Sequence, residues 1–301
     1  MRYLRLIVVI TALILFAGGG MYYAAFRNVS TAPSKGMVPV VGSFYPLANF
    51  AENVGGERVS VTNVTPAGAE PHGFEPAPRQ IAQIQTAKLF IMNGAGLDPW
   101  AEKLKPELLA KGVRVIDMSE HFHLLPPSDP HFWVDPVMAG QEVALIRDAL
   151  SEIDPAHSNE YSANAAAYLE KLSALDQSFR TGLAVCEIHD VITSHAAFGY
   201  LAQEYSFIQV PIAGLSPDEE PSPKTLARVA DEARAKNIKY IFFESLVSPK
   251  MADTLAQEIG AKTLVFDPLE GLTQSQVANG EDYISIQRQN LENLKIALSC
   301  K

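Results

Sequence analysis

The sequence predicts an α/β protein with two lobes, each built on a four-stranded, mostly parallel sheet flanked by helices, and a long helix that joins them. Three observations support this fold class. Short β-branched runs alternate with helical runs from residue 38 onward, the same alternation resumes after residue 185, and one uninterrupted helical pattern lies between the two halves. Strands that alternate with helices of about 10–15 residues are typical of βαβ units and parallel sheets.

The first half of this alternation predicts an N-terminal lobe. Each strand-like run rich in branched residues is followed by a helix-like run. The expected strands cover residues 38–44, 59–65, 89–94 and 113–117, and the expected helices cover residues 46–56, 77–87, 98–110 and 136–153. We therefore place the N-terminal lobe at residues 38–157.

A long helix is predicted between the lobes. Apolar residues recur every three or four positions, and no Gly or Pro interrupts the pattern before Gly182. These positions are Tyr161, Ala165, Tyr168, Leu172, Leu175, Phe179 and Leu183. At about 1.5 Å per residue, residues 158–184 form a rod of about 40 Å that spans both lobes. We expect a linker helix within residues 158–185 and little closure of one lobe onto the other.

The second half repeats the rhythm and predicts a C-terminal lobe at residues 186–301. Pro223 stands near the start of one expected helix and Gly260 ends another, as is usual for these residues. The expected strands cover residues 190–195, 207–214, 238–245 and 263–268, and the expected helices cover residues 222–237, 248–260 and 281–299.

The N-terminal residues 1–26 are predicted to direct export. Arg2 and Arg5 precede an apolar run, which is typical of a secretory signal. The apolar character continues to Phe26, so an uncleaved membrane anchor is the alternative. Residues 27–37 are expected to be a flexible tether. No Cys stands near the end of the run, so a lipoprotein form is not expected. The protein is predicted to be periplasmic or otherwise extracytoplasmic.

The net charge bears on the binding partner, and the cysteine content bears on a disulfide. The net charge is −10 and no basic cluster occurs, which argues against nucleic acid as a partner. Cys186 and Cys300 are the two cysteines of a chain that we expect to enter an oxidising compartment. A disulfide between them is expected, with two free thiols as the alternative.

Four side chains lie at or after the carboxyl ends of predicted strands. They are His72, His131, His195 and Asp267. Because ligands of parallel sheets bind at this edge, these side chains should converge if the lobes face each other. Three imidazoles and a carboxylate suit Zn²⁺ in tetrahedral geometry. The sequence therefore predicts a metal site and no catalytic residue.

Neighbouring residues have two interpretations each. Glu70 and Glu75 could accept hydrogen bonds from His72 or be solvated, and Glu244 could approach the metal or only form a hydrogen bond. Four aromatic residues could exclude water from the metal or simply pack in the core. They are Tyr45, Trp100, Trp133 and Phe198.

The motifs resemble those of a known family. Among them are "GAEPHGFEP", "DPHFWVDP", "SHAAFGYLAQEYSF" and "FDPLEGL". From about Val38 to the C-terminus, the chain is similar to the zinc/manganese solute-binding proteins of ABC importers, the ZnuA/TroA-like family. The resemblance implies two α/β lobes, a helical linker and one metal held by His72, His131, His195 and Asp267. It also implies a monomeric receptor that delivers metal to an ABC permease and its ATPase.

The resemblance also bears on the metal. Manganese importers of this family tend to carry Glu where this chain has His195, and a third imidazole favours Zn²⁺ over Mn²⁺. The segment before His131 is short and contains only His121 and His123, either a remnant of a histidine-rich loop or surface residues.

Three other functions are alternatives to a zinc receptor: a manganese or iron receptor, a metal-dependent adhesin or sensor, and a metallohydrolase. The hydrolase is disfavoured because no H-E-x-x-H motif occurs and four protein ligands would close the site.

Overall fold

The computed structural model describes residues 36–301 of the chain. The expected signal or anchor and most of the expected tether lie outside the described residues. Residues Met37–Lys301 form one compact unit. Within this described part, no helix is both long enough and apolar enough to cross a membrane.

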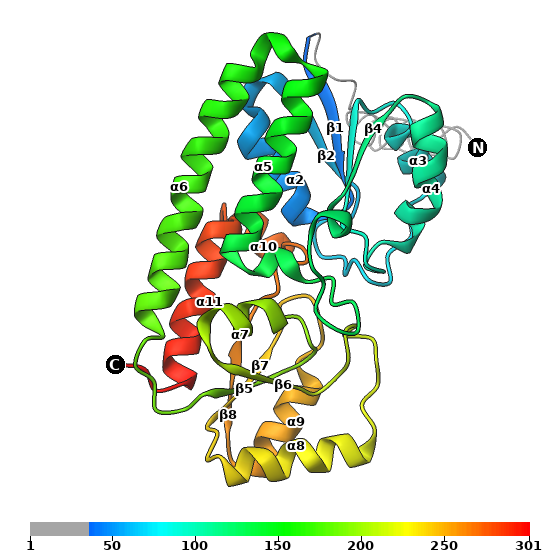
Figure 1. Cartoon of the computed structure of the whole chain (residues 1–301). Helices are drawn as coiled ribbons and strands as arrows, with labels where there is room; N and C mark the ends of the chain where they lie inside the picture. Colours follow the sequence, from blue (N-terminus) through cyan, green and yellow to red (C-terminus); the bar gives the residue numbers. More distant parts are fainter. Residues whose placement is uncertain (1–35) are drawn as a thin grey trace, which may run out of the picture. The chain divides into compact units, whose positions relative to one another are not determined.

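The N-terminal lobe is a parallel four-stranded sheet with helices on its faces (Figure 1). The strand order is β2-β1-β3-β4, so the first strand lies inside the sheet. All four residues of the third strand are buried, as expected for a strand covered on both faces. The elements are β1 (Val38–Gly42), α2 (Tyr45–Gly55), β2 (Val59–Asn63), α3 (Pro78–Ile84), β3 (Leu89–Met92), α4 (Pro99–Ala110), β4 (Arg114–Asp117) and α5 (Pro136–Ile153).

The C-terminal lobe repeats this architecture with a parallel sheet in the order β6-β5-β7-β8. The predicted fold class is confirmed, while two short helices, α7 and α10, were not predicted. The elements are β5 (Asp190–Thr193), α7 (Gly199–Tyr205), β6 (Ile208–Pro211), α8 (Pro223–Ala235), β7 (Tyr240–Phe243), α9 (Lys250–Ile259), β8 (Lys262–Val265), α10 (Gln274–Ala278) and α11 (Tyr283–Ala297).

The linker helix α6 (Ser158–Gly182) runs alongside both lobes (Figure 1). Six of the apolar positions predicted for its inner face are buried: Tyr161, Ala165, Tyr168, Leu172, Leu175 and Phe179. This face packs on α5 and α2 of the first lobe and on α11 of the second. The helix therefore belongs to the cores of both lobes.

The two lobes share one hydrophobic core. A single cluster of buried residues includes Phe50 and Trp133 of the first lobe together with Phe266 and Tyr283 of the second. Hydrogen bonds also connect the two lobes. The Trp133 indole donates to the Pro268 carbonyl at 2.8 Å, and the Tyr283 hydroxyl donates to the Trp133 carbonyl at 2.6 Å. The junction between the lobes is thus packed as an interior.

The expected disulfide between Cys186 and Cys300 is present in the structure. It joins the segment between α6 and β5 to the residues beyond α11. Backbone hydrogen bonds from Glu187 and Ile188 to the Leu298 carbonyl, at 3.1 and 3.0 Å, reinforce the same connection. The C-terminal helix is therefore fixed to the beginning of its own lobe.

Candidate metal centre

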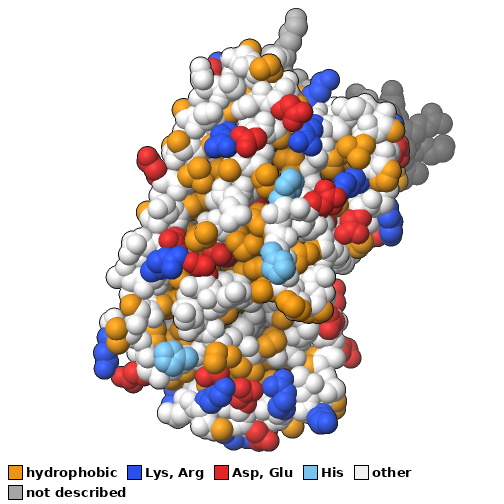
Figure 2. Space-filling view, in the orientation of Figure 1, with side chains coloured by type: hydrophobic (Ala, Val, Ile, Leu, Met, Phe, Trp, Pro, Cys, Tyr) orange, Lys and Arg blue, Asp and Glu red, His pale blue; other side chains and the backbone are white. Residues whose placement is uncertain are grey.

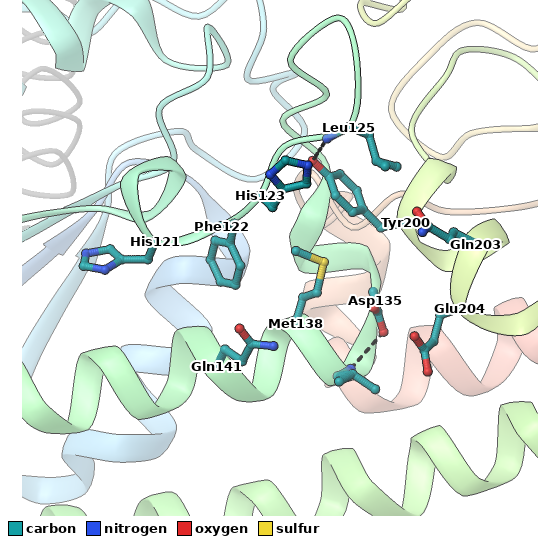
Figure 3. A pocket seen from close by; sticks show the side chains of 11 residues that line it. His121, Phe122, His123, Leu125, Asp135, Met138, Gln141, Tyr200, Gln203 and Glu204 are labelled. Carbon is teal, nitrogen blue, oxygen red and sulfur yellow. Dashed lines mark hydrogen bonds between the residues drawn. The ribbon is translucent and has the colours of Figure 1, made fainter.

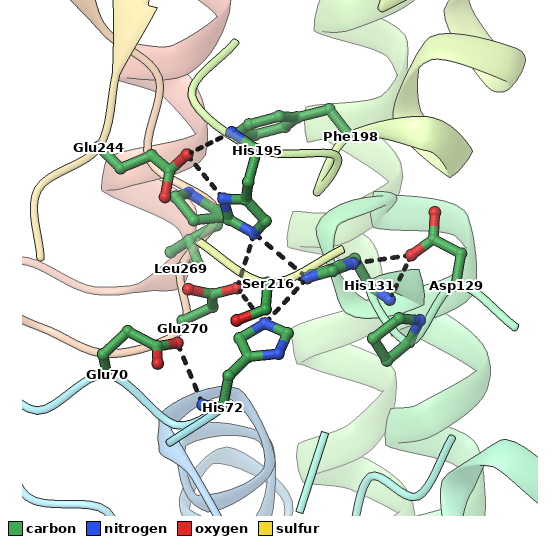
Figure 4. A network of polar contacts seen from close by, with 12 residues as sticks. Glu70, His72, Asp129, His131, His195, Phe198, Ser216, Glu244, Leu269 and Glu270 are labelled. Atoms are coloured by element: carbon green, nitrogen blue, oxygen red, sulfur yellow. Dashed lines mark hydrogen bonds and ion pairs between the residues drawn. The ribbon is translucent and has the colours of Figure 1, made fainter. Parts of the chain in front are cut away.

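Four side chains from four separate segments meet where the lobes join: His72, His131, His195 and Glu270 (Figure 4). His72 lies in the loop after β2, and His131 follows β4 just before a short 3-10 turn. His195 and Glu270 follow β5 and β8 in the second lobe. Each loop leaves the carboxyl end of a parallel strand, which is where the sequence predicted the site.

The ligand atoms of this cluster are spaced as a tetrahedral zinc site requires. The Nε2 atom of His131 lies 3.2 Å from that of His72 and 3.3 Å from that of His195. The Glu270 Oε1 atom lies 3.1, 3.3 and 3.2 Å from the Nε2 atoms of His72, His131 and His195. A tetrahedron with zinc–ligand distances of about 2.0 Å has edges of about 3.3 Å, so an ion fits between these atoms.

The carboxylate of the cluster belongs to Glu270, which corrects the expectation for Asp267. The Asp267 carboxylate instead accepts hydrogen bonds from the Leu269 amide at 2.8 Å and the Gln276 side chain at 3.0 Å. Leu269 has a φ of 60°, a left-handed conformation that is costly for a branched residue. Asp267 thus supports the turn that carries Glu270 to the imidazoles.

Two further carboxylates fix the orientation of two imidazoles. Asp129 Oδ1 lies 2.7 Å from His131 Nδ1 and accepts from its backbone amide at 2.9 Å. Glu244 Oε1 lies 2.7 Å from His195 Nδ1 and accepts from its backbone amide at 3.2 Å. A hydrogen bond at Nδ1 leaves the Nε2 lone pair directed at the centre of the cluster.

The other predicted neighbours of His72 have different positions. Glu70 accepts from the backbone amides of His72 at 3.1 Å and Gly73 at 3.3 Å, and not from the imidazole. Glu75 is exposed. Asp129 was missed by the sequence analysis, although its position two residues before His131 in the "DPH" motif was the available signal.

The imidazoles and carboxylates of the cluster shift one another's pKa values. Burial alone would lower the pKa of His131 and His195. Hydrogen bonds to Asp129 and Glu270 raise the pKa of His131 above the ordinary value, and the charges of Glu244 and Glu270 raise that of His195 well above it. Burial alone would raise the pKa of Glu270, but the imidazoles, His195 foremost, hold it well below the ordinary range. Without metal, the site therefore retains protons that an ion has to displace.

Aromatic residues form part of the wall around the site. The Trp133 ring centroid lies 5.2 Å from that of His131. Phe198 is fully buried, stacks on Phe266 and lies beside His195 (Figure 4). Trp100 packs in a separate cluster with Phe90, away from the imidazoles.

His121 and His123 lie outside the cluster. They line a separate surface pocket of about 390 Å³ together with Tyr200 and Asp135 (Figure 3).

Across the face shown in Figure 2, acidic and basic side chains are interspersed without a large patch of one sign.

Two parallel-sheet lobes joined by a long helix, with imidazoles from both lobes around one centre, define a two-lobed metal receptor. The sequence model described as "ZnuA: Zinc-uptake complex component A periplasmic" matches residues 40–297. The chain belongs to the ZnuA family, and the resemblance predicted from its motifs is confirmed.

Relatives with zinc in their names share most of the chain. The "High-affinity zinc uptake system protein ZnuA" of Bacillus subtilis is 39% identical over 97% of this chain and 98% of that protein. The "Zinc-binding lipoprotein AdcA" of Streptococcus pneumoniae is 38% identical over 91% of this chain, which spans 58% of that longer relative.

Solved structures show the same fold. The Zn(II)-bound ZnuA-like domain of Streptococcus pneumoniae AdcA is 40% identical, covers 87% of this chain and 99% of its own, and has a TM-score of 0.79. The laminin-binding protein Lmb of Streptococcus agalactiae, described as having adhesin and metal-transporting activity, is 33% identical with a TM-score of 0.78, over 87% of this chain and 99% of its own.

Proposed function

We propose that this chain is the extracytoplasmic zinc-binding component of a high-affinity uptake system. It binds one Zn²⁺ through His72, His131, His195 and Glu270 and releases the ion to a membrane permease driven by an ATPase. The observation that carries the proposal is that five distances between the ligand atoms lie from 3.1 to 3.3 Å, close to the edge length of a zinc tetrahedron.

The donor set favours zinc over manganese. Three imidazole nitrogens and one carboxylate oxygen suit Zn²⁺, whereas Mn²⁺ prefers sites richer in oxygen. Four protein ligands also leave no open coordination position for an attacking water, so the proposed role is binding and delivery rather than catalysis. We expect a monomeric, exported protein.

Competition titration with a zinc chelator tests the ligand set. Alanine at His72, His131 or Glu270 removes a ligand, and each variant should lose more affinity than the roughly 10–100-fold typical of changes to a ligand's hydrogen-bond partner. His189→Ala is the matched control, because His189 is exposed and lies outside the cluster.

The same titration separates the two candidate carboxylates. Asp267→Asn keeps the size of a side chain that supports the loop and should retain zinc binding far better than Glu270→Gln. Wild-type affinity in both His72→Ala and His131→Ala would place the zinc site elsewhere.

Delivery to a permease is tested in cells. Growth of a strain lacking this protein in medium depleted of zinc should be restored by the wild-type chain and not by His131→Ala at equal protein level. Equal rescue by both would contradict a role in uptake.

Adhesion is the second candidate function, supported by the similarity to Lmb. It predicts that the purified chain binds immobilised laminin, whereas a dedicated zinc receptor does not.

A further inference from the structure

The four side chains of the cluster are not equally enclosed. The His131 and His195 side chains are 0% exposed and that of Glu270 is 1% exposed, but the His72 side chain is 9% exposed. An ion at the centre of this cluster is therefore closest to solvent on the His72 side.

The imidazoles also differ in how firmly they are held. Carboxylates bind Nδ1 of His131 and His195, as described above. Among the described residues, the hydrogen bonds of the His72 ring involve only Nε2, at the centre of the cluster. His72 is thus the imidazole whose ring has no second partner to restrain it.

The second lobe also holds the Asp129 side of the site through hydrogen bonds and close packing. The Tyr200 hydroxyl at the start of α7 donates to the Asp129 carbonyl at 2.7 Å and accepts from the Leu125 amide at 3.0 Å. A Cβ at Gly199 would lie only 2.7 Å from Asp129 Oδ2, so the two segments are in close contact. The second lobe therefore packs closely on the Asp129 side of the site.

The loop between β6 and α8 of the second lobe, residues 212–222, lies against the His72 side of the site. Its base is fixed, because the Ala196 amide donates to the Gly214 carbonyl and the Ala213 amide donates to the Ser194 carbonyl, both at 2.8 Å. Its tip is a turn in which Ser216 lies beside the cluster (Figure 4) and the Asp218 amide donates to the Ser216 hydroxyl.

This loop meets the His72 loop at one glycine. A Cβ added at Gly73 would lie 3.3 Å from Asp218 Oδ2, so the carboxylate occupies the space where a side chain at residue 73 would begin. Gly73 and Asp218 are both exposed, and Gly73 does not have a positive φ. Glycine at this position therefore allows the two loops to approach closely rather than serving a special backbone conformation.

We propose that zinc enters and leaves the site past His72, between Gly73 of the first lobe and Asp218 of the second. This inference rests on the proposed zinc-binding function and adds the route of exchange. The carboxylates of Asp218 and Glu70 flank this route and attract a divalent cation, and any side chain at residue 73 would crowd the contact with Asp218.

A side chain placed at the contact between Gly73 and Asp218 tests the route. Gly73→Val should slow both zinc loading and zinc release about tenfold, because an overpacked contact raises the barrier to passage. The dissociation constant should stay unchanged, because valine at residue 73 touches the route and not the bound ion. Stopped-flow mixing of the full chain with Zn²⁺, and of the loaded chain with excess chelator, measures both rates.

A second substitution links the effect to Asp218. In Gly73→Val combined with Asp218→Ala, the space vacated by the carboxylate accommodates the valine, and both rates should return to those of Asp218→Ala alone. Glu220→Ala is the matched control, because it removes an exposed acid of the same loop without making room at Gly73. Gly73→Ala should give a smaller slowing and keeps the test valid if valine impairs folding.

Several outcomes would overturn the inference. Unchanged rates in Gly73→Val, or equal slowing with and without the Asp218 side chain, would show that zinc passes elsewhere. Faster release with weaker affinity would show that residue 73 acts on the ligand geometry instead. Failure of the wild-type chain to bind zinc at all would overturn the proposed function itself and is seen in the equilibrium titration before any variant is made.

Discussion

At the scale of single residues, zinc and protons compete for the same imidazole nitrogens. The pKa values of His131 and His195 lie above the ordinary 6.5, so their protonation stabilises the zinc-free fold fully below that pH. This contribution is lost as the pH rises through the raised pKa values. Zinc binding needs neutral imidazoles and is therefore increasingly favoured as the pH rises through these pKa values.

Zinc should accordingly raise the thermal unfolding temperature more at pH 8 than at pH 6. Differential scanning calorimetry of zinc-free and zinc-loaded protein measures the difference at each pH. Mg²⁺ is the control, because it prefers oxygen ligands and should give almost no shift. A zinc-induced shift that is larger at pH 6 would contradict the coupling described above.

Glu142 is a buried acid that the proposed function does not use. Its side chain is fully buried on α5, and neither carboxylate oxygen has a hydrogen-bond partner in the described part of the chain. Burial raises the pKa of Glu142 well above the ordinary 4.5. The cost is absent below pH 4.5 and grows as the pH rises, because the unfolded chain ionises freely and the folded chain does not.

Glu142→Met, which is similar in length and apolar, should therefore increase the free energy of unfolding at pH 8 by about 1–3 kcal/mol. The gain should shrink towards pH 4.5. Urea unfolding at both pH values measures it. Glu152→Met on the same helix is the control, because it removes only an exposed ion pair with Arg114 and should change the free energy of unfolding by about 1 kcal/mol at most. Destabilisation at pH 8 would mean that Glu142 has a partner in solution.

The difference between Asp267 and Glu270 shows where prediction from sequence ends at this scale. The three histidines each follow a strand, and parallel strands bring their carboxyl ends to one edge, so their convergence was predictable. The motif "FDPLEGL" contains two acids, and the one nearer the strand was chosen. The left-handed Leu269, which turns Glu270 inward, depends on tertiary contacts that periodicity does not report.

At the scale of elements, long periodic helices were predictable and short ones were not. The buried face of α6 was predicted position by position from Tyr161 to Phe179. The helices α7 and α10 have 7 and 5 residues, which is too few to establish a helical period. Yet α7 contributes Tyr200, which fixes the Asp129 loop, so part of the site's support was invisible in the sequence pattern.

The link between Cys186 and Cys300 acts on a single element, the helix α11. The two cysteines are separated by 114 residues. For a loop of this length the chain-entropy model gives an upper limit of about 5 kcal/mol. Backbone bonds to Leu298 also hold this end, so local opening of the helix should reduce the realised value.

The Cys186→Ser, Cys300→Ser double variant should therefore unfold at a lower temperature than wild type, while binding one zinc ion per chain as before. Neither cysteine belongs to the cluster of metal-ligating side chains. Thermal unfolding and zinc analysis of the same samples test both statements. A loss of zinc stoichiometry in the folded double variant would show that the C-terminal helix controls the site.

At the scale of the whole described unit, the lobes are joined by more than the linker helix. Phe50 of α2 packs edge-on against Tyr283 of α11, with ring centroids 5.0 Å apart. The linker helix itself also packs on the second lobe, since Phe179 of α6 stacks on Tyr205 of α7 at 4.9 Å. Hinge closure would have to separate these fully or largely buried aromatic pairs, which is costly because each buries a large apolar area.

We therefore expect zinc to bind without large movement of the lobes. Small-angle X-ray scattering profiles of zinc-free and zinc-saturated protein should coincide within error, because exchange needs only the loops around His72 and Asp218 to move. A receptor that closes about a hinge becomes more compact on binding its ligand. A clear fall in radius of gyration on zinc saturation would contradict the expectation of little lobe movement, and it would also mean that the contact between Gly73 and Asp218 belongs to one state of the protein only.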